Sequence, residues 1–484
     1  MVLNAITAEG LDENPVARSL LEQAPPQMDP QDPRGLSLPP IELCRRWQRS
    51  FCPLEERFFS SEQELIQHYL DDLGFVPRPV PLEQLNPSIL QALSSQMEDV
   101  LPGLMPSSGF ANIREGVRAK LEQFLLREVD LPTGSTLRIF GSSASGFGND
   151  TSDLDMCIVY PPKATLPQNY GDLIEGIAER LTGNGMLEVD CRSTARIPIV
   201  MFKDPSTSLK CDISVVNPLA VRNTQLLKVY SEADPRVKAL AYVVKNWAKR
   251  RRINNASEGT LSSYGYLLCL LHFLQTRNPP VVPNLQALPP DWTGQPMPLG
   301  PPSRHLPRHD VLQPVDGHYY NTYFFDPMAS GEHRSQGASA LRAFCSRNKE
   351  TLGSLLAGFF RYYGHELDSR KHIVSVRLGD VADRERKAEE SCWGLHTRLS
   401  IEDPFETWYD VAHVLKWSRY KHVHTEFMRA YSVLVNTTRA DDILPTLWEE
   451  VGSPFNKNEE RASQEAAEEE AERLRLVDLE AHAL

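Results

Sequence analysis

Residues 141–155 read GSSASGFGNDTSDLD and place a Gly-Ser turn shortly before a pair of carboxylates, Asp153 and Asp155. The run LRIF that precedes Gly141 predicts a strand, so the turn or helix that follows it opens at Ser142. Because side chains alternate along a strand, the two carboxylates point to the same face while their apolar neighbours point into a core. These residues predict a sheet edge that carries two neighbouring acids.

A third carboxylate, Asp212, lies inside the apolar run LKCDISVV. The segment ARIPIVMF comes before it, and the joining residues KDPSTS are typical of a turn, so the two runs predict a hairpin that adds Asp212 to the same sheet. A D-x-D pair alone would be typical of a solvated strand end. The turn before the pair and the third acid after it favour a functional interpretation.

Three carboxylates at this spacing repel one another unless cations lie between them. Mg²⁺ accepts carboxylate oxygens together with substrate phosphates, and a pair of such ions activates a hydroxyl and neutralises a leaving pyrophosphate. The acids therefore predict a two-metal site, with Mg²⁺ or Mn²⁺, for nucleotidyl transfer. In this interpretation Asp153 and Asp155 hold both ions, and Asp212 completes the ion that activates a 3′-hydroxyl.

With these motifs the chain resembles the DNA polymerase β-like nucleotidyltransferases, and among them the terminal uridylyltransferases and cytoplasmic-type poly(A) polymerases. The resemblance covers residues 108–453 and continues through NPLAVRNTQLL, VVKNWAKRRRINNASEGTLSSYGYLL, NPPVVPNLQ and IEDPFE. It implies an α+β fold: a polymerase β-like nucleotidyltransferase domain, with a mixed sheet and helices, followed by a mainly helical PAP-associated domain. The active site is expected in the cleft between them.

The resemblance implies a set of residues that hold the triphosphate. Lys245 and Lys249 are four residues apart, so they share one face of a predicted helix; a solvated charged face is the alternative interpretation. By resemblance, these lysines act together with Ser263 and with the turn at Gly141 and Ser142, where exposed backbone N–H groups suit phosphate oxygens.

A second set is implied for the ribose and base. Tyr264 resembles the platform on which the incoming base stacks, and Asn223 the residue that contacts the ribose 2′-hydroxyl. Asp403 and Glu406 match acids that shape the base pocket. Well-known uridylyltransferases carry a His three residues after that Glu, whereas this chain has Tyr409, so the choice between UTP and ATP stays open.

The net charge of −13 argues against a protein that coats nucleic acid, so RNA binding is expected from a local groove with a basic cluster at Lys245, Lys249 and Arg250 to Arg252. No RRM, KH or zinc-knuckle motif is present, so the protein must either bind the 3′ end weakly by itself or be brought to RNA by a partner protein. Eight cysteines without a C-x-x-C pair indicate reduced thiols, and the longest apolar run is too short to cross a bilayer. These features predict a protein of the cytoplasm, with the nucleus as the alternative, that does not enter a membrane.

Composition and periodicity divide the chain into five predicted parts. Residues 1–40 are expected to be disordered, 41–107 to form a helical extension and 108–217 to form the catalytic domain. Residues 218–455 are expected to form the helical central and PAP-associated domain, with a Pro-rich, surface-exposed loop between Pro279 and Pro314. An acidic tail occupies 456–484.

The sequence thus predicts a template-independent enzyme that adds UMP, or AMP, from the triphosphate to RNA 3′ ends and so influences RNA turnover or processing. A poly(A) polymerase with ATP preference is one alternative. A catalytically silent scaffold that binds RNA or protein is another, and transfer to a small-molecule acceptor is a third.

Overall fold

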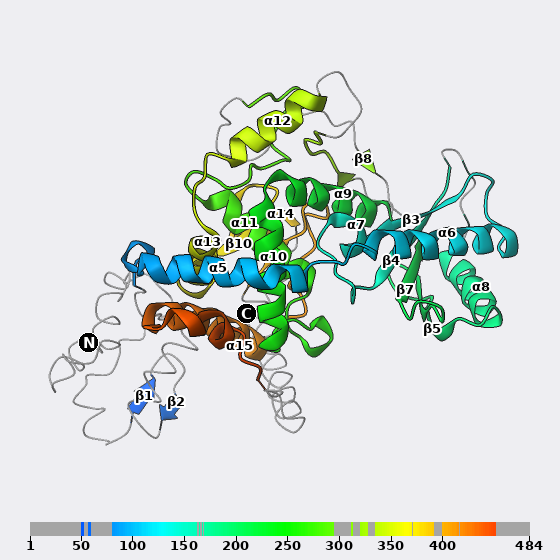
Figure 1. The fold of residues 1–484 in the computed structure, drawn as a ribbon. Helices are drawn as coiled ribbons and strands as arrows, with labels where there is room; N and C mark the ends of the chain where they lie inside the picture. Colours follow the sequence, from blue (N-terminus) through cyan, green and yellow to red (C-terminus); the bar gives the residue numbers. More distant parts are fainter. Residues whose placement is uncertain are drawn as a thin grey trace, which may run out of the picture.

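A computed structural model describes residues 80–451 except 162–163, 165–166, 168, 295–310, 313–319, 328–333, 370, 392–398 and 416. It also describes two short strands, β1 (Ser50–Cys52) and β2 (Arg57–Phe59), which pair antiparallel. The predicted acidic tail, the first 40 residues and most of the Pro-rich loop lie outside the described residues. Figure 1 shows a sheet-containing unit beside a larger helical one.

The smaller unit is built on a five-stranded sheet with the order β3-β4-β7-β6-β5. Its strands are β3 (Thr136–Phe140), β4 (Leu154–Val159), β5 (Leu187–Arg192), β6 (Ile199–Lys203) and β7 (Lys210–Val215). Strands β4 and β7 are parallel, and the other neighbours are antiparallel. The hairpin predicted around Asp212 is β6 and β7, and the strand predicted before Gly141 is β3.

One face of this sheet packs on helices α6 (Phe110–Glu128) and α8 (Tyr170–Gly183), which lie together at one end of the molecule in Figure 1. The core consists of alternating strand residues such as Leu154, Met156 and Ile213 against Val117 and Ile174. The opposite face of the sheet carries the acids of β4 and β7 and faces the helical unit. Alternation along the strands therefore separates the packing residues from the polar ones.

The larger unit has a second core of helices. These are α5 (Pro87–Leu104), α9 (Pro218–Ala233), α10 (Pro235–Arg250), α11 (Ser263–Thr276), α12 (Arg334–Cys345), α13 (Leu352–Arg361), α15 (Trp417–Asn436) and α16 (Ile443–Leu447). Trp247 lies at the centre of an aromatic cluster with Phe360 and Phe427, at ring-centroid distances of 4.9 and 5.1 Å. Side chains of α5 belong to this core, so the N-terminal extension contributes one of its helices.

A three-stranded sheet with the order β11-β10-β12 covers one side of α11. Its strands are β10 (His372–Ser375), β11 (Asp380–Asp383) and β12 (Ile401–Glu402), and α14 (Arg384–Ser391) follows β11. A separate two-stranded ribbon pairs β8 (Val311–Leu312) with β9 (Tyr320–Asn321). In the parallel pair of the three-stranded sheet, Ser375 and Glu402 are register partners, which fixes the point where the IEDPFE segment leaves the sheet.

Two expectations about these regions are wrong. The loop after Pro279 is not surface-exposed along its first part, because Val281, Val282, Leu285 and Trp292 are buried in the helical core. The segment around Phe51, expected to be helical, contains strand β1, since aromatic residues fit a hairpin well. In the loop after Pro279, a local composition signal is overridden by the packing of apolar side chains.

Candidate active site

The turn after β3 brings the chain against one of the predicted metal ligands. Gly141 has φ 67° and ψ −150°, a conformation that only glycine adopts readily. A Cβ at Gly141 would lie 2.2 Å from Asp155 Oδ2, so the carboxylate rests directly on the glycine. The Gly141 N–H donates to Thr224 Oγ1 at 2.8 Å, which ties the turn to helix α9. Thr224 was not predicted from the sequence.

Asp155 on β4 and Asp212 on β7 are register partners in adjacent parallel strands, and Asp153 immediately precedes β4. Burial, and then the charges of Asp212 and Asp153, raise the pKa of Asp155 to about 7. Burial and the charge of Asp153 raise the pKa of Asp212 to about 6, opposed by Arg192 and Lys210. The three carboxylates therefore share one electrostatic environment in which a bound cation would relieve their repulsion.

Among the described residues, no three Asp, Glu, His or Cys side chains converge closely enough to hold a metal ion by themselves. Mg²⁺ does not require such a set, because it is commonly held by one or two carboxylates while substrate phosphates and water complete the shell. The hard oxygen donors and the mutual repulsion of Asp153, Asp155 and Asp212 fit Mg²⁺ or Mn²⁺ in this way.

The loop that carries Asp153 is held by Arg114 of helix α6, a buried residue that the sequence analysis missed. Its guanidinium donates to the carbonyl oxygens of Asn149, Asp150 and Ser152, the last at 2.7 Å, and to Ser143 Oγ at 3.1 Å. Ser143 in turn donates to the Asp153 carbonyl at 2.9 Å. Arg114 also stacks on Phe110, with the guanidinium carbon 3.7 Å from the ring centroid. The available sequence signal was its spacing: Arg114 comes three residues before Val117 and seven before Leu121, so it shares the apolar face of the helix.

A cavity of about 360 Å³ opens beside these acids, between the sheet and the helical unit. Of the predicted residues, seven line it: Gly141, Ser142, Asp155, Asn223, Lys245, Ser263 and Tyr264. Lys245 is partly buried; burial and the neighbouring charge of Lys249 lower the pKa of its ammonium group, while Asp153 opposes the shift. The cavity therefore joins acids, a lysine and a backbone turn, which suits the phosphates of a nucleotide.

The other six predicted residues, Asp153, Asp212, Lys249, Asp403, Glu406 and Tyr409, do not line this cavity. Asp403 nevertheless connects to it, because Asp403 Oδ2 accepts from Tyr264 Oη at 2.9 Å and from Asn223 Nδ2 at 3.2 Å. Asn223 Oδ1 is buried and has no hydrogen-bond partner among the described residues. An unpartnered acceptor at a cavity wall suits a hydroxyl or amino donor of a ligand.

Glu406 and Tyr409 lie where the helical unit meets the sheet. Arg196, in the turn between β5 and β6, pairs with Glu406 at 2.7 Å, Nη1 to Oε1. Its guanidinium carbon is 5.2 Å from the centroid of the Tyr409 ring and 5.8 Å from that of Trp408. The His413 ring is 5.1 Å from that of Tyr409, and His413 is exposed. These contacts connect the two units across the cleft.

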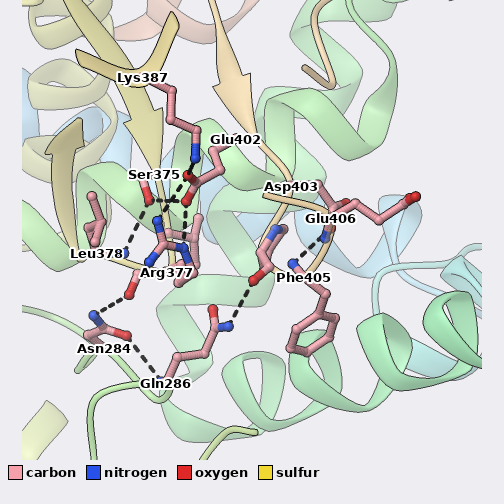
Figure 2. Close-up of polar contacts among 12 residues, drawn as sticks. Asn284, Gln286, Ser375, Arg377, Leu378, Lys387, Glu402, Asp403, Phe405 and Glu406 are labelled. Atoms are coloured by element: carbon pink, nitrogen blue, oxygen red, sulfur yellow. Dashed lines mark hydrogen bonds and ion pairs between the residues drawn. The ribbon is translucent and has the colours of Figure 1, made fainter. Parts of the chain in front are cut away.

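A buried ion-pair network holds the IEDPFE segment in place (Figure 2). Glu402 is fully buried and accepts from Arg377 Nε at 2.8 Å, from Ser375 Oγ at 2.8 Å and from Lys387 Nζ. The cationic partners hold the pKa of Glu402 below its usual range, although burial acts in the opposite direction. The carboxylate of the next residue, Asp403, accepts the N–H groups of Phe405 and Glu406. The segment is therefore held in place by hydrogen bonds to the side chains of Glu402 and Asp403.

The predicted basic cluster is only partly available to a ligand. Arg251 is buried and pairs with Glu426 at 2.7 Å, Nε to Oε2, so it has a packing role. Arg250 pairs with Glu450 at 3.4 Å near the protein surface. The cluster lies at the C-terminal end of α10, which ends at Arg250. No described helix is both long and apolar enough to cross a membrane.

Two family models match the chain. The central palm domain of mitochondrial-like poly(A) RNA polymerases matches residues 93–232, and the Cid1 family poly(A) polymerase model of the PAP-associated domain matches residues 351–408. Poly(A) RNA polymerase cid13 of Schizosaccharomyces pombe is 29% identical over 81% of this chain and 61% of its own length. Human terminal uridylyltransferase 7 is 35% identical over 67% of this chain and 20% of its own length. The chain thus spans about three fifths and one fifth of these relatives.

Solved structures agree in fold. A cytoplasmic RNA terminal U-transferase aligns with a TM-score of 0.59 at 29% identity, covering 75% of this chain and 99% of that one. The Cid1 poly(U) polymerase with Mg 3′-dATP bound aligns with a TM-score of 0.59 at 28% identity, covering 74% and 99%. The expected α+β architecture is therefore confirmed.

Proposed function

Because the chain belongs to the Cid1 family of poly(A)/poly(U) polymerases with a PAP-associated domain, we propose that it is a template-independent RNA 3′-terminal nucleotidyltransferase. It transfers UMP, or AMP, from the nucleoside triphosphate to the 3′ end of an RNA. A bond forms between the 3′ oxygen and the α-phosphorus, the bond to pyrophosphate breaks, and the hydroxyl proton is released.

The observation that carries this proposal is the pairing of Asp155 with Asp212 beside a cavity lined by Gly141, Ser142 and Lys245. Asp153, Asp155 and Asp212 would hold Mg²⁺ or Mn²⁺. When bound, these ions lower the pKa of the attacking hydroxyl and neutralise charge on the departing pyrophosphate.

The remaining residues bind and orient the nucleotide. Lys245 and Lys249 neutralise the triphosphate from one face of α10, and Ser142 and Ser263 supply hydrogen bonds to it. Tyr264 is oriented by its hydrogen bond to Asp403, so its ring is a fixed surface for the base.

Recognition of the ribose and base is assigned to the neighbouring polar groups. The unpartnered Asn223 Oδ1 accepts a hydrogen bond from a ribose hydroxyl. A deoxyribonucleotide lacks that hydroxyl and would leave this buried acceptor unsatisfied, so its binding is disfavoured. Asp403 and Glu406 shape the base pocket with Tyr409.

UTP is the first choice for the substrate, supported by the 35% identity to a terminal uridylyltransferase. ATP is the second candidate, and the specific observation that favours it is Tyr409. Its ring is 5.2 Å from the Arg196 guanidinium carbon and 5.1 Å from the His413 ring, and its phenol carries no charge at neutral pH, where a His would provide a titratable group. The acceptor is the 3′ end of an RNA in the cytoplasm, brought to the enzyme by a partner protein.

The test is to incubate the protein with labelled single-stranded RNA, Mg²⁺ or Mn²⁺, and each of the four triphosphates separately. Extension with UTP, with a smaller yield from ATP, is expected, and a reversed ratio identifies the poly(A) polymerase alternative. RNA binding without extension by any triphosphate would instead support the silent scaffold. Unlabelled RNA should compete with the labelled RNA; failure to compete would point to a small-molecule acceptor.

A further inference from the structure

Trp408 is a large apolar side chain that is exposed to solvent, on a loop where residues 406–407 and 409–410 are partly buried. It is 42% exposed, whereas Trp247, Trp292 and Trp448 are buried. It directly precedes Tyr409, in the loop that begins with Asp403. An indole displayed this way costs solvation free energy, so its position suggests contact with a ligand.

The loop fixes where the indole stands. The backbone of Tyr409 is held at both ends, since its N–H donates to the Glu406 carbonyl at 2.7 Å and its carbonyl accepts from the Asp403 N–H at 3.2 Å. The Trp408 and Tyr409 rings are 6.2 Å apart and nearly perpendicular, at 81°. The Arg196 guanidinium, 5.8 Å from the indole centroid, comes from the opposite unit. Trp408 therefore faces the sheet across the cleft and is preorganised.

The sheet face opposite the indole leads directly to the acids. Asp212 on β7 is the register partner of Met201 on β6, and Ile199, two residues from Met201, is the partner of Arg192 on β5. Registered side chains in neighbouring strands share a face, so Asp212, Met201, Ile199 and Arg192 form one strip. Met201 also has Asp190 on β5 as a register partner, and Arg192 Nε pairs with Asp190 Oδ2 at 3.3 Å. The strip therefore runs from Asp212 to an exposed ion pair whose cation is Arg192.

We propose that Trp408 is the platform on which a base near the 3′ end of the acceptor RNA stacks, while the backbone of that strand follows Arg192 on the sheet. This inference rests on the proposed function. The incoming base is assigned to Tyr264, on the cavity side of the acids, and the acceptor 3′-hydroxyl must reach Asp212 from the other side. A flat aromatic surface and a cation at that side match the π-face and phosphate of a single strand.

The first test compares Trp408→Ala, Trp408→Phe and the wild type in steady-state extension of a short single-stranded RNA. Loss of one stacked base should raise the KM for RNA by about 5-fold to 150-fold and leave the KM for the nucleotide within about twofold. Trp408→Phe should recover most of the affinity. Leu126→Ala, at an exposed position of α6 on the far end of the sheet unit, is the matched control and should change neither value.

The second test separates stacking from a role in holding the two units together. Acceptor RNAs carrying a single abasic nucleotide at successive positions from the 3′ end are compared with the intact RNA. At one position the abasic RNA should lose affinity for the wild type but not for Trp408→Ala, because the base and the indole act as a pair. Equal losses with both proteins at every position, or an unchanged KM for RNA in Trp408→Ala, would overturn the inference. A wild type that extends no RNA would instead refute the proposed function.

Discussion

Replacing Gly141 with Ala is expected to lower the tailing rate strongly while leaving a folded, less stable protein. Two costs follow from the structure. At φ 67° and ψ −150°, a side chain is strained by about 1–3 kcal/mol. The new Cβ would also lie 2.2 Å from Asp155 Oδ2, where ordinary contacts begin at 3.4 Å, so the carboxylate must move by about 1 Å.

The expected loss of stability is about 2–5 kcal/mol, within the range that a folded protein tolerates. The tailing rate is expected to fall by about 100-fold, because a displacement of about 1 Å in a group at the reaction centre costs about that factor in rate. Urea denaturation measures the first effect, and the initial rate of RNA tailing at saturating nucleotide measures the second.

Gly134→Ala is the matched control. Gly134 also has positive φ, 91°, but a Cβ there would meet only Pro161 at 3.7 Å, which is an ordinary contact. This variant should lose about 1–2 kcal/mol of stability and keep its tailing rate. If Gly141→Ala is folded and tails RNA as fast as Gly134→Ala, the close approach of Asp155 to the turn has no part in catalysis and the reasoning fails.

Three further predictions follow from the same site. Arg114→Met should lower kcat more than it raises the nucleotide KM, and it should lower the free energy of unfolding in urea by about 2–4 kcal/mol, because three carbonyl oxygens lose their donor. The control Arg127→Met, at an exposed position, should lower it by less than about 0.5 kcal/mol. A similar loss of stability in both variants would contradict the role of Arg114. Glu402→Ala should lower the free energy of unfolding by about 3–5 kcal/mol and raise the nucleotide KM, because Arg377 and Lys387 lose a buried partner. Exposed Glu115→Ala is the control, and equal nucleotide KM values in the two variants would refute the positioning role of Glu402. In metal-free protein the folded-state pKa values of Asp155, about 7, and Asp212, about 6, lie above those of the unfolded chain, so their contribution to stability falls as pH rises from about 4 to about 7. Buried His272 and His365, whose pKa values are lowered to about 4, change the stability in the opposite direction, so the quantity to measure is the difference in unfolding free energy between wild type and Asp155→Asn at each pH. As pH rises from about 4 to about 7, the variant should gain about 2–4 kcal/mol of stability relative to wild type. A difference that stays constant with pH would contradict the electrostatic account.

The sequence was most informative where periodicity and chemistry agreed. The strand before Gly141, the hairpin that carries Asp212 and the helix that carries Lys245 were each predicted from a local pattern, whereas the α+β architecture was implied by the family resemblance. These elements are decided by alternation and by turn residues over a few positions, so little long-range information is needed.

The residues that support the site were not predictable in the same way. Arg114 and Thr224 act through carbonyl and N–H groups far away in the sequence, and Arg196 meets Glu406 only because two units face each other. Arg251 had the same local appearance as its neighbours but is buried against Glu426. Such pairings depend on tertiary packing, which a charge pattern along the chain does not encode.

The measurement that tests the central claim most directly is single-turnover tailing by Asp155→Ala and Asp212→Ala, with folding checked by urea denaturation of each variant. If these carboxylates serve the transfer, both folded variants should lose at least about 1,000-fold in rate with Mg²⁺ and UTP, because an interaction made in the transition state is removed. Extension of RNA by either folded variant at the wild-type rate would contradict the account.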